Sequence, residues 1–103
     1  MRTLDYKELL NERLQDAKYA ASYLTEVLAN EPYSTFLIAL RDVIDARTES
    51  TSSLAKQIGV TKEALLKAMS MDGNLGLLTL NEVLKVLGLK ISFVSLEANK
   101  NTT

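Results

Sequence analysis

The residues best suited to chemistry lie between Thr51 and Ser70, where lysines, hydroxyls and a carboxylate alternate with aliphatic side chains. Lys62 could donate to guanine O6 and N7 or to a phosphate, Glu63 could accept from a cytosine amino group, and Leu66 could contact a thymine methyl. Hydroxyls, a second lysine and helix N-terminal amides suit phosphate oxygens. This is the chemistry of holding and reading DNA. The candidate DNA-contacting residues are Thr51, Ser52, Thr61, Lys62, Glu63, Leu66, Lys67, Ser70 and Asn74.

Small and aliphatic residues in the same segment predict the turn that would present these side chains. Two short helices that meet at a sharp angle need a small residue at their closest approach, which Ala55 supplies, and a turn that tolerates positive φ, which Gly59 supplies. The inner sides of both helices would be formed by Leu54, Ile58, Val60, Leu65 and Ala68. This spacing is typical of a DNA-binding helix-turn-helix. A simple αα-hairpin can show similar offsets, and the polar side chains favour the DNA-binding interpretation.

Several residue types that enzymes use are missing from the chain. There is no Cys, no His and no Trp among the 103 residues. This removes thiolate nucleophiles, His general bases, disulfides and zinc sites built from sulfur or imidazole. Chemistry by carboxylates alone stays open, but the thirteen acidic residues are spread along expected helical faces, where a solvated charge is the usual role. We therefore expect no enzyme, no cofactor and no metal site.

The charge of the chain is unevenly distributed, although the total is only −1. Residues 1–50 carry six basic and nine acidic side chains, a net of −3. Residues 51–90 carry five lysines against three carboxylates, a net of +2. The positive potential therefore lies on the segment that would face DNA, as phosphate binding requires.

The length and composition indicate a single domain over 1–103, with 47% hydrophobic and 24% charged residues. Apolar residues at three- and four-residue steps predict a compact all-α fold of five to six helices. We expect N-terminal helices over 1–33 and a helix-turn-helix core over 34–88. A short C-terminal β-strand over 89–96 and a disordered tail over 97–103 would follow.

Capping residues predict where the helices begin and end. Capping boxes are expected at Asp5 with Glu8 and at Thr79 with Glu82. The loop over 70–78 holds glycines and an Asn that can accept positive φ. The other expected helix limits, in chain order, are Asp16, Ala29, Ser34 or Thr35, Arg47, Ser52, Ile58, Thr61 and Gly88.

The segment over 89–96 differs from the rest because β-propensive residues partly alternate with polar ones. Leu89, Ile91 and Phe93 occupy alternate positions, with Lys90 and Ser92 between them. One strand cannot satisfy its own backbone hydrogen bonds, and no second strand is evident in the chain. Pairing with a second subunit, and hence a dimer, is one way to complete it.

Three stretches together carry a resemblance to a known family: Ala-Leu-Arg-Asp-Val at 39–43, the helix-turn-helix at 54–70, and Gly73-Asn74. Over about residues 5 to 94 the sequence resembles the probable addiction-module antidote proteins, which are HigA-like antitoxins with a Cro/C1-type helix-turn-helix. The resemblance implies a lambda-repressor-like fold and neutralisation of a RelE/ParE-like toxin by direct binding. It also implies a homodimer that binds double-stranded operator DNA and represses its own operon.

The chain departs from the family pattern at positions that bear on base recognition. The family usually has Arg where Lys62 stands and Tyr where Leu66 stands. It usually has Pro and Arg where Leu75 and Gly76 stand. Because Lys is only a point donor and Leu reads little beyond a methyl group, these departures leave the operator sequence open.

Two other functions fit the same observations. The acidic half over 1–50 could bind a basic partner in a protein-interaction module with little DNA binding. A phage-type repressor without a toxin would differ only in the neighbouring gene. The N-terminus has no basic region followed by an apolar core, and no apolar stretch approaches the roughly 20 residues of a membrane span. We therefore expect a cytoplasmic protein without a membrane partner.

Overall fold

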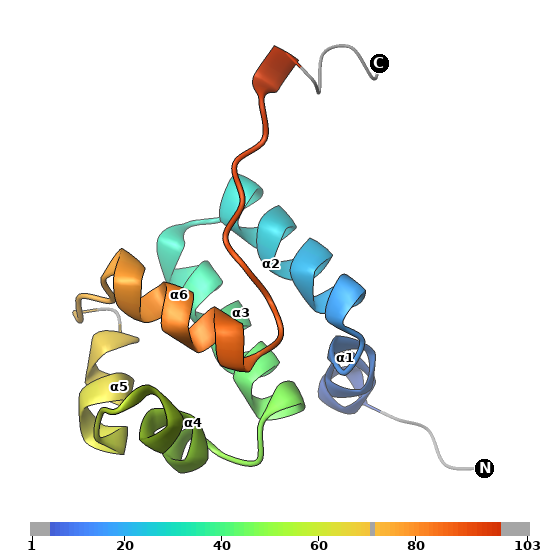
Figure 1. The fold of residues 1–103 in the computed structure, drawn as a ribbon. Coiled ribbons are helices and arrows are strands. Elements are labelled where there is room, and N and C mark those ends of the chain that lie inside the picture. The colour runs from blue at the N-terminus through green and yellow to red at the C-terminus, as the bar shows by residue number, and fades with distance from the viewer. Residues whose placement is uncertain (1–4, 71, 98–103) are drawn as a thin grey trace.

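Six α-helices form the regular structure of the chain in this computed structural model, which describes residues 5–70 and 72–97 (Figure 1). The expected all-α architecture is confirmed. No helix among the described residues is long and apolar enough to cross a membrane. The helices are α1 (Tyr6–Leu14), α2 (Ala17–Asn30), α3 (Tyr33–Arg47), α4 (Thr51–Ile58), α5 (Lys62–Ala68) and α6 (Leu77–Val86).

Side-chain caps begin three of the helices where the sequence predicted them. The Asp5 carboxylate accepts from the Glu8 backbone N–H at 2.8 Å, and the Glu8 carboxylate accepts from the Asp5 N–H at 3.5 Å, which completes the capping box of α1. The Asp16 carboxylate accepts from a first-turn N–H of α2 at 3.0 Å. Thr61 does the same for α5. Each cap satisfies a backbone donor that has no partner within its helix.

Three helices begin at other residues than expected. Helix α3 starts at Tyr33 after Pro32, and α4 starts at Thr51 with Ser50 as its cap. The capping box predicted at Thr79 and Glu82 is wrong. Helix α6 already begins at Leu77, because the Gly76 carbonyl accepts the first helical hydrogen bond, from the Leu80 N–H at 2.9 Å. The Glu82 carboxylate instead pairs with the Lys85 ammonium at 3.3 Å.

Two glycines end helices in the left-handed conformation. Gly59 follows α4 with φ 80°, and Gly88 follows α6 with φ 82°. In both places the next residue donates its N–H back to the helix: Val60 to the Ala55 carbonyl at 3.0 Å and Leu89 to the Leu84 carbonyl at 2.8 Å. This is the Schellman arrangement, which satisfies carbonyls at a helix end and favours glycine. Both helix ends were predicted.

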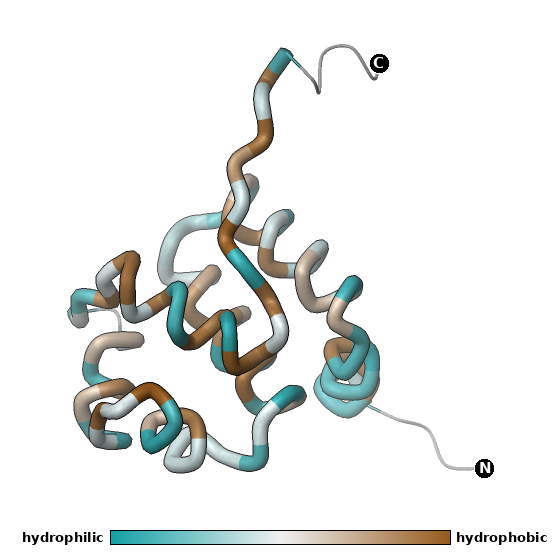
Figure 2. Tube along the Cα trace, in the orientation of Figure 1, coloured by the Kyte–Doolittle hydropathy of each residue, from teal (hydrophilic) through white to brown (hydrophobic). Residues whose placement is uncertain are grey.

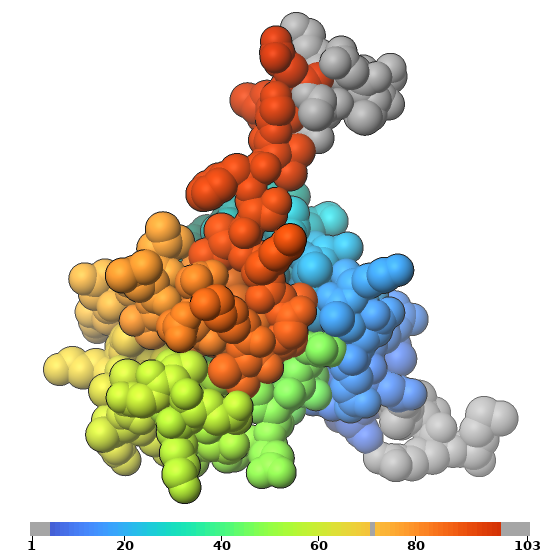
Figure 3. Space-filling model, viewed as in Figure 1, coloured from blue at the N-terminus to red at the C-terminus, as the bar shows by residue number. Residues whose placement is uncertain are grey.

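The β-strand predicted over 89–96 is absent, and no strand occurs anywhere in residues 5–70 and 72–97. Residues 89–95 are extended without a pairing partner, because no other segment of the chain lies alongside them as a strand. Figure 2 shows hydrophobic and hydrophilic residues along this segment, and Figure 3 shows it leaving the helical body. Of the tail predicted to be disordered, 98–103 lies outside the described residues.

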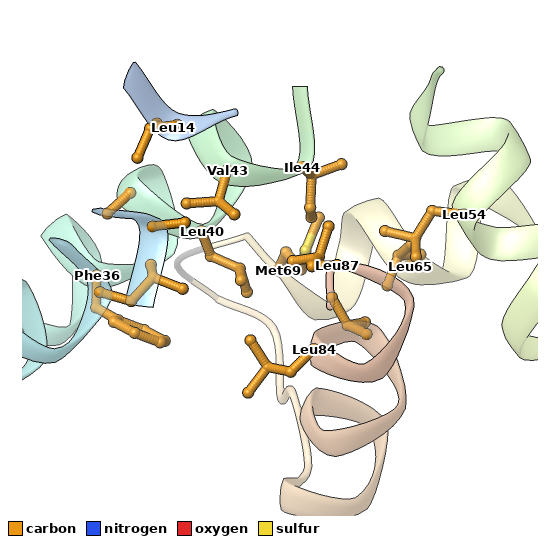
Figure 4. Close-up of a cluster of buried hydrophobic side chains, with 14 of the residues drawn as sticks. Leu14, Phe36, Leu40, Val43, Ile44, Leu54, Leu65, Met69, Leu84 and Leu87 are labelled. Carbon is orange, nitrogen blue, oxygen red and sulfur yellow. The ribbon is translucent and has the colours of Figure 1, made fainter. Parts of the chain in front are cut away.

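The hydrophobic core is centred on α3, which packs against α1 and α2. Six residues of α3 are buried, and all but Leu37 belong to one cluster with side chains from α4, α5 and α6 (Figure 4). Helix α4 packs against both α5 and α6. One core therefore joins the N-terminal helices to α4, α5 and α6. The largest fully buried side chains are Leu14, Leu40, Val43, Ile44, Leu54, Leu65, Val83 and Leu87.

Arg47 links three helix ends, a role that the sequence did not indicate. Its guanidinium donates to the carbonyl oxygens of Leu87 at 2.6 Å, Gln15 at 2.5 Å and Leu14 at 3.4 Å. These carbonyls lie at the C-terminal ends of α6 and α1, where a positive charge is favoured by the helix dipoles. Arg47 therefore fixes the last turns of α1, α3 and α6 relative to one another.

Candidate nucleic-acid interface

The candidate interface is built on α4 and α5, which are joined by a turn over residues 59–61 (Figure 1). The Ser50 hydroxyl accepts from the Ser53 N–H at 3.0 Å at the start of α4. Gly59 reverses the chain at its end, and the Thr61 hydroxyl oxygen accepts from the Ala64 N–H at 3.0 Å to begin α5. The path of the chain from α4 through the turn into α5 thus follows from one glycine and two local caps.

The inner sides of α4 and α5 are buried largely as predicted. Leu54, Ala55 and Leu65 are buried almost completely. Ile58 and Ala68 are half-buried. Val60 differs, because 39% of its surface remains exposed in the turn. The buried residues anchor both helices to α3 and α6 and leave their other sides exposed.

Most predicted DNA-contacting side chains lie in the solvent. Leu66 is half-buried and packs against the core, so its side chain offers less surface to a thymine methyl than the sequence suggested. Thr51, the first residue of α4, is also half-buried. The exposed candidates are Ser52, Thr61, Lys62, Glu63, Lys67, Ser70 and Asn74.

Two candidate hydroxyls differ in what they can still donate. The Thr61 oxygen accepts a hydrogen bond, so its proton is free to reach a phosphate. The Ser70 hydroxyl already donates to the Lys67 carbonyl at 2.8 Å. Thr61 is therefore the better phosphate donor of the two.

The lysines of this region are available to a ligand. Lys56 in α4 and Lys62 and Lys67 in α5 are exposed, and none forms an ion pair with a residue that the structure describes. Lys56 is not among the predicted contacts. It lies one helical turn after Ser52 on the exposed side of α4. This four-residue spacing could have identified Lys56 as a further candidate contact from the sequence. Together the three ammonium groups give the two helices the charge that phosphates require.

Gly73 holds the loop after α5 close to that helix. Its N–H donates to the Ser70 carbonyl at 2.9 Å. A Cβ at this position would lie 2.0 Å from the Lys67 carbonyl oxygen and 2.7 Å from that of Ala68. The glycines and the Asn of this loop can accept positive φ but do not adopt it, because among the described residues only Gly59 and Gly88 have a positive φ. Gly73 is needed for close backbone approach, and it sets where the exposed Asn74 follows α5.

A second polar feature lies on the acidic half of the chain. A groove of about 480 Å³ between α1 and α3 is lined by four acidic residues, by one lysine, Lys7, and by neutral residues. The acidic residues are Glu8, Glu12, Asp42 and Asp45. The Tyr23 hydroxyl donates to Asp42 at 3.3 Å. Burial, followed by the Asp42 charge, raises the pKa of Tyr23 to about 12. Burial also raises the pKa of Asp42, although the Tyr23 hydrogen bond and the Lys7 charge oppose that shift.

Comparison with known proteins places the chain in a family. The family model described as "Probable addiction module antidote protein" matches residues 5–95. An uncharacterized protein of Haemophilus influenzae is 34% identical over 79 residues, which cover 77% of this chain and 79% of the relative. No solved structure matches the chain significantly. The chain therefore belongs to the probable addiction module antidote family.

Proposed function

We propose that this protein is an antitoxin that binds operator DNA through α4 and α5 and represses its own operon. The observation that carries the proposal is the arrangement of Lys56, Lys62 and Lys67 on the exposed sides of two helices whose inner sides are buried. In a helix-turn-helix the second helix enters the major groove while the first crosses the backbone. Helix α5 is the reading helix in this proposal, and α4 contacts phosphates.

Individual side chains then take separate roles. Lys62 begins α5 and Glu63 follows it, so both lie at the N-terminal end that contacts base edges in such proteins. Lys62 would donate to guanine or phosphate, and Glu63 would accept from cytosine. Lys67, Ser52 and Thr61 would hold phosphates. As a homodimer, the protein would present two copies of α5 about one helical turn of DNA apart, on a pseudo-palindromic site.

Binding to DNA from the protein's own promoter tests this proposal by fluorescence anisotropy at several salt concentrations. Lys62→Ala combined with Lys67→Ala should abolish specific binding near physiological salt. At low salt, the dependence of log affinity on log salt should become shallower by about two for each protomer. Lys7→Ala combined with Lys18→Ala removes the same charge from α1 and α2. This control should change the DNA affinity and its salt dependence little. Equal affinity of the two double variants would refute a reading role for α5.

The antidote family implies a cognate toxin as a second partner. We place this partner on the acidic half of the chain, where the carboxylates of the groove between α1 and α3 complement a basic protein surface. An antidote acts by binding, so this role needs no catalytic group. The family membership also favours an antitoxin over a phage-type repressor.

The second candidate function, binding of a basic partner with little DNA binding, rests on the same groove. Purified protein should be titrated with promoter DNA and with the product of the adjacent gene, separately and together. Partner binding without DNA binding would favour the interaction module. Binding to both supports the antitoxin that represses its operon.

A further inference from the structure

The groove between α1 and α3 carries more negative charge than its own lysine can balance. One positive and four negative side chains line it, a net charge of −3. Glu12, Asp42 and Asp45 form no ion pair with a basic residue in the part of the chain that the structure describes. Asp42 and Asp45 are three residues apart on α3, so both lie on one side of that helix. The groove therefore offers a positively charged partner acceptors that the protein itself leaves open.

Tyr23 connects this groove to two further tyrosines. Its hydroxyl on α2 donates to Asp42 Oδ2 on α3 at 3.3 Å. Tyr19 lies one helical turn before Tyr23 on α2. Tyr6 and Tyr19 both lie close enough to Tyr23 for their ionised hydroxyls to contribute to its raised pKa. Since Tyr6 is 75% exposed and Tyr19 37%, accessible aromatic rings flank the Asp42 end of the groove.

Asp42 is a carboxylate that burial leaves poorly solvated. It is half-buried, and burial raises its pKa, because water stabilises its charge less than that of an exposed carboxylate. The Tyr23 hydroxyl occupies Oδ2 and leaves Oδ1 open. The Lys7 charge lowers the pKa of Asp42 but forms no ion pair with it. A cation that binds Oδ1 would replace part of the solvation that burial removes.

We propose that the cognate toxin binds this surface through an arginine, whose guanidinium pairs with the Asp42 and Asp45 carboxylates and packs against the neighbouring tyrosines. The inference rests on the proposed function for the identity of the partner. Arginine fits better than lysine, because its planar guanidinium donates to two acceptors at once, is more weakly hydrated and stacks on aromatic rings. Tyrosine and arginine are also the residue types that often dominate the energetics of protein interfaces.

The same surface does not suit DNA. Its net negative charge repels phosphates. Figure 1 shows α1 well apart from α4 and α5, the helices that carry the exposed lysines of the candidate DNA interface. Toxin binding on α1 and α3 would therefore leave α4 and α5 open to DNA, and the two activities can be removed separately.

Isothermal titration calorimetry of the full chain with the product of the adjacent gene tests the charged part of the site. Asp42→Asn combined with Asp45→Asn should weaken toxin binding at least about tenfold, because the guanidinium loses its charged acceptors. Glu26→Gln combined with Glu31→Gln removes the same charge from exposed positions near the end of α2, and should weaken binding less than about twofold. Lys7→Ala should strengthen binding, because it removes a competing cation. Equal affinity of the two double variants would overturn the proposal.

Tyr6 tests the aromatic part of the site. Tyr6→Ala should weaken toxin binding at least about fivefold, whereas Tyr6→Phe should keep most of the affinity, because the ring and not the hydroxyl packs against the guanidinium. Tyr33→Ala, at a tyrosine 53% exposed on α3, is the matched control. Equal losses in Tyr6→Ala and Tyr33→Ala would contradict the aromatic contact.

A probe without the toxin distinguishes failure of this inference from failure of the proposed function. Tetra-arginine amide and tetra-lysine amide should be titrated into the isotope-labelled full chain and followed by NMR. Tetra-arginine should shift the amide signals around the groove at lower concentration than tetra-lysine, and Asp42→Asn combined with Asp45→Asn should reduce those shifts. Shifts that are equal for both peptides, or centred elsewhere, would overturn the arginine site even where the toxin binds. A toxin that does not bind the unmodified chain would refute the antitoxin function and, with it, the toxin as the occupant.

Discussion

Arg47 Nε donates to the Leu87 carbonyl oxygen at 2.6 Å, across forty residues of sequence, and so joins the end of α3 to the end of α6. The same guanidinium reaches the Gln15 carbonyl at the end of α1. A guanidinium has several donors in a fixed plane, so one side chain can hold two helix ends at a set distance. This link fixes α6, against which α4 packs, relative to the N-terminal helices.

Replacing Arg47 should therefore destabilise the whole domain. Arg47→Met leaves three carbonyls without a charged donor, and we expect the free energy of unfolding to fall by about 1–3 kcal/mol. Arg47→Lys should recover only part of this loss, because an ammonium is a point donor. Urea unfolding followed by circular dichroism measures both. Arg41→Met, at an exposed position of the same helix, is the control, and an equal loss there would contradict the link.

Gly73→Ala should disturb the loop that follows α5. The added Cβ would meet the Lys67 carbonyl oxygen at 2.0 Å, so backbone must move, at a cost of about 1–3 kcal/mol. Gly76→Ala is a matched control in the same loop, since nothing lies within 4 Å of a Cβ there. Thermal unfolding gives the melting temperatures of the two variants, and that of Gly73→Ala should be the lower. A similar melting temperature for both would show that the close approach at Gly73 does not limit stability.

The raised pKa of Tyr23 predicts that the protein loses stability at alkaline pH. Its folded pKa of about 12 exceeds the ordinary value of 10.0, so the unfolded chain releases this proton first as pH rises. The stabilisation is complete below pH 10 and is lost between about pH 10 and 12. Tyr23→Phe should lack this decline, and it should also lack the tyrosinate absorbance that appears near pH 12 in the unmodified protein. Identical alkaline titrations of the two proteins would contradict the prediction.

Asp42 also loses a stabilising contribution as pH rises, but at a lower pH than Tyr23. Because burial raises its folded pKa, the contribution of the protonated carboxyl is complete below the ordinary value of 3.8 and is lost as pH rises through the folded pKa. Asp42→Asn keeps an acceptor for the Tyr23 hydroxyl and removes the charge. We expect the variant to be more stable than the parent at pH 7, with the difference shrinking towards pH 3. Urea unfolding at both values tests this, and a variant less stable at pH 7 would refute it.

Lys56 should contribute to DNA affinity but not to sequence preference. On the proposed function its ammonium contacts a phosphate from α4, so Lys56→Ala should weaken binding to cognate and unrelated DNA by a similar factor. Lys62→Ala should weaken cognate binding more than unrelated binding. Competition experiments with cognate and unrelated DNA give, for each variant, the ratio of its affinities for the two DNAs. A change of sequence preference in Lys56→Ala would place that lysine on a base.

The sequence by itself determined the features that depend on neighbours along the chain. Asp5, Asp16 and Thr61 cap backbone donors two or three residues away, and Gly59 and Gly88 end their helices through bonds to the preceding turn. The six helices and the turn between α4 and α5 were predictable because these interactions are complete within a few residues.

Tertiary structure decided the features whose partners are distant in sequence. Helix α6 begins at Leu77 rather than Thr79, and Leu66 turns partly into the core rather than out to solvent. The Arg47 link depends on residues more than thirty positions away. The segment over 89–96 has the residue pattern of a strand but does not form one, because the ladder needs a second segment that this chain does not place beside it. Local sequence specifies a propensity, and only the packed fold determines whether a partner is present to satisfy it.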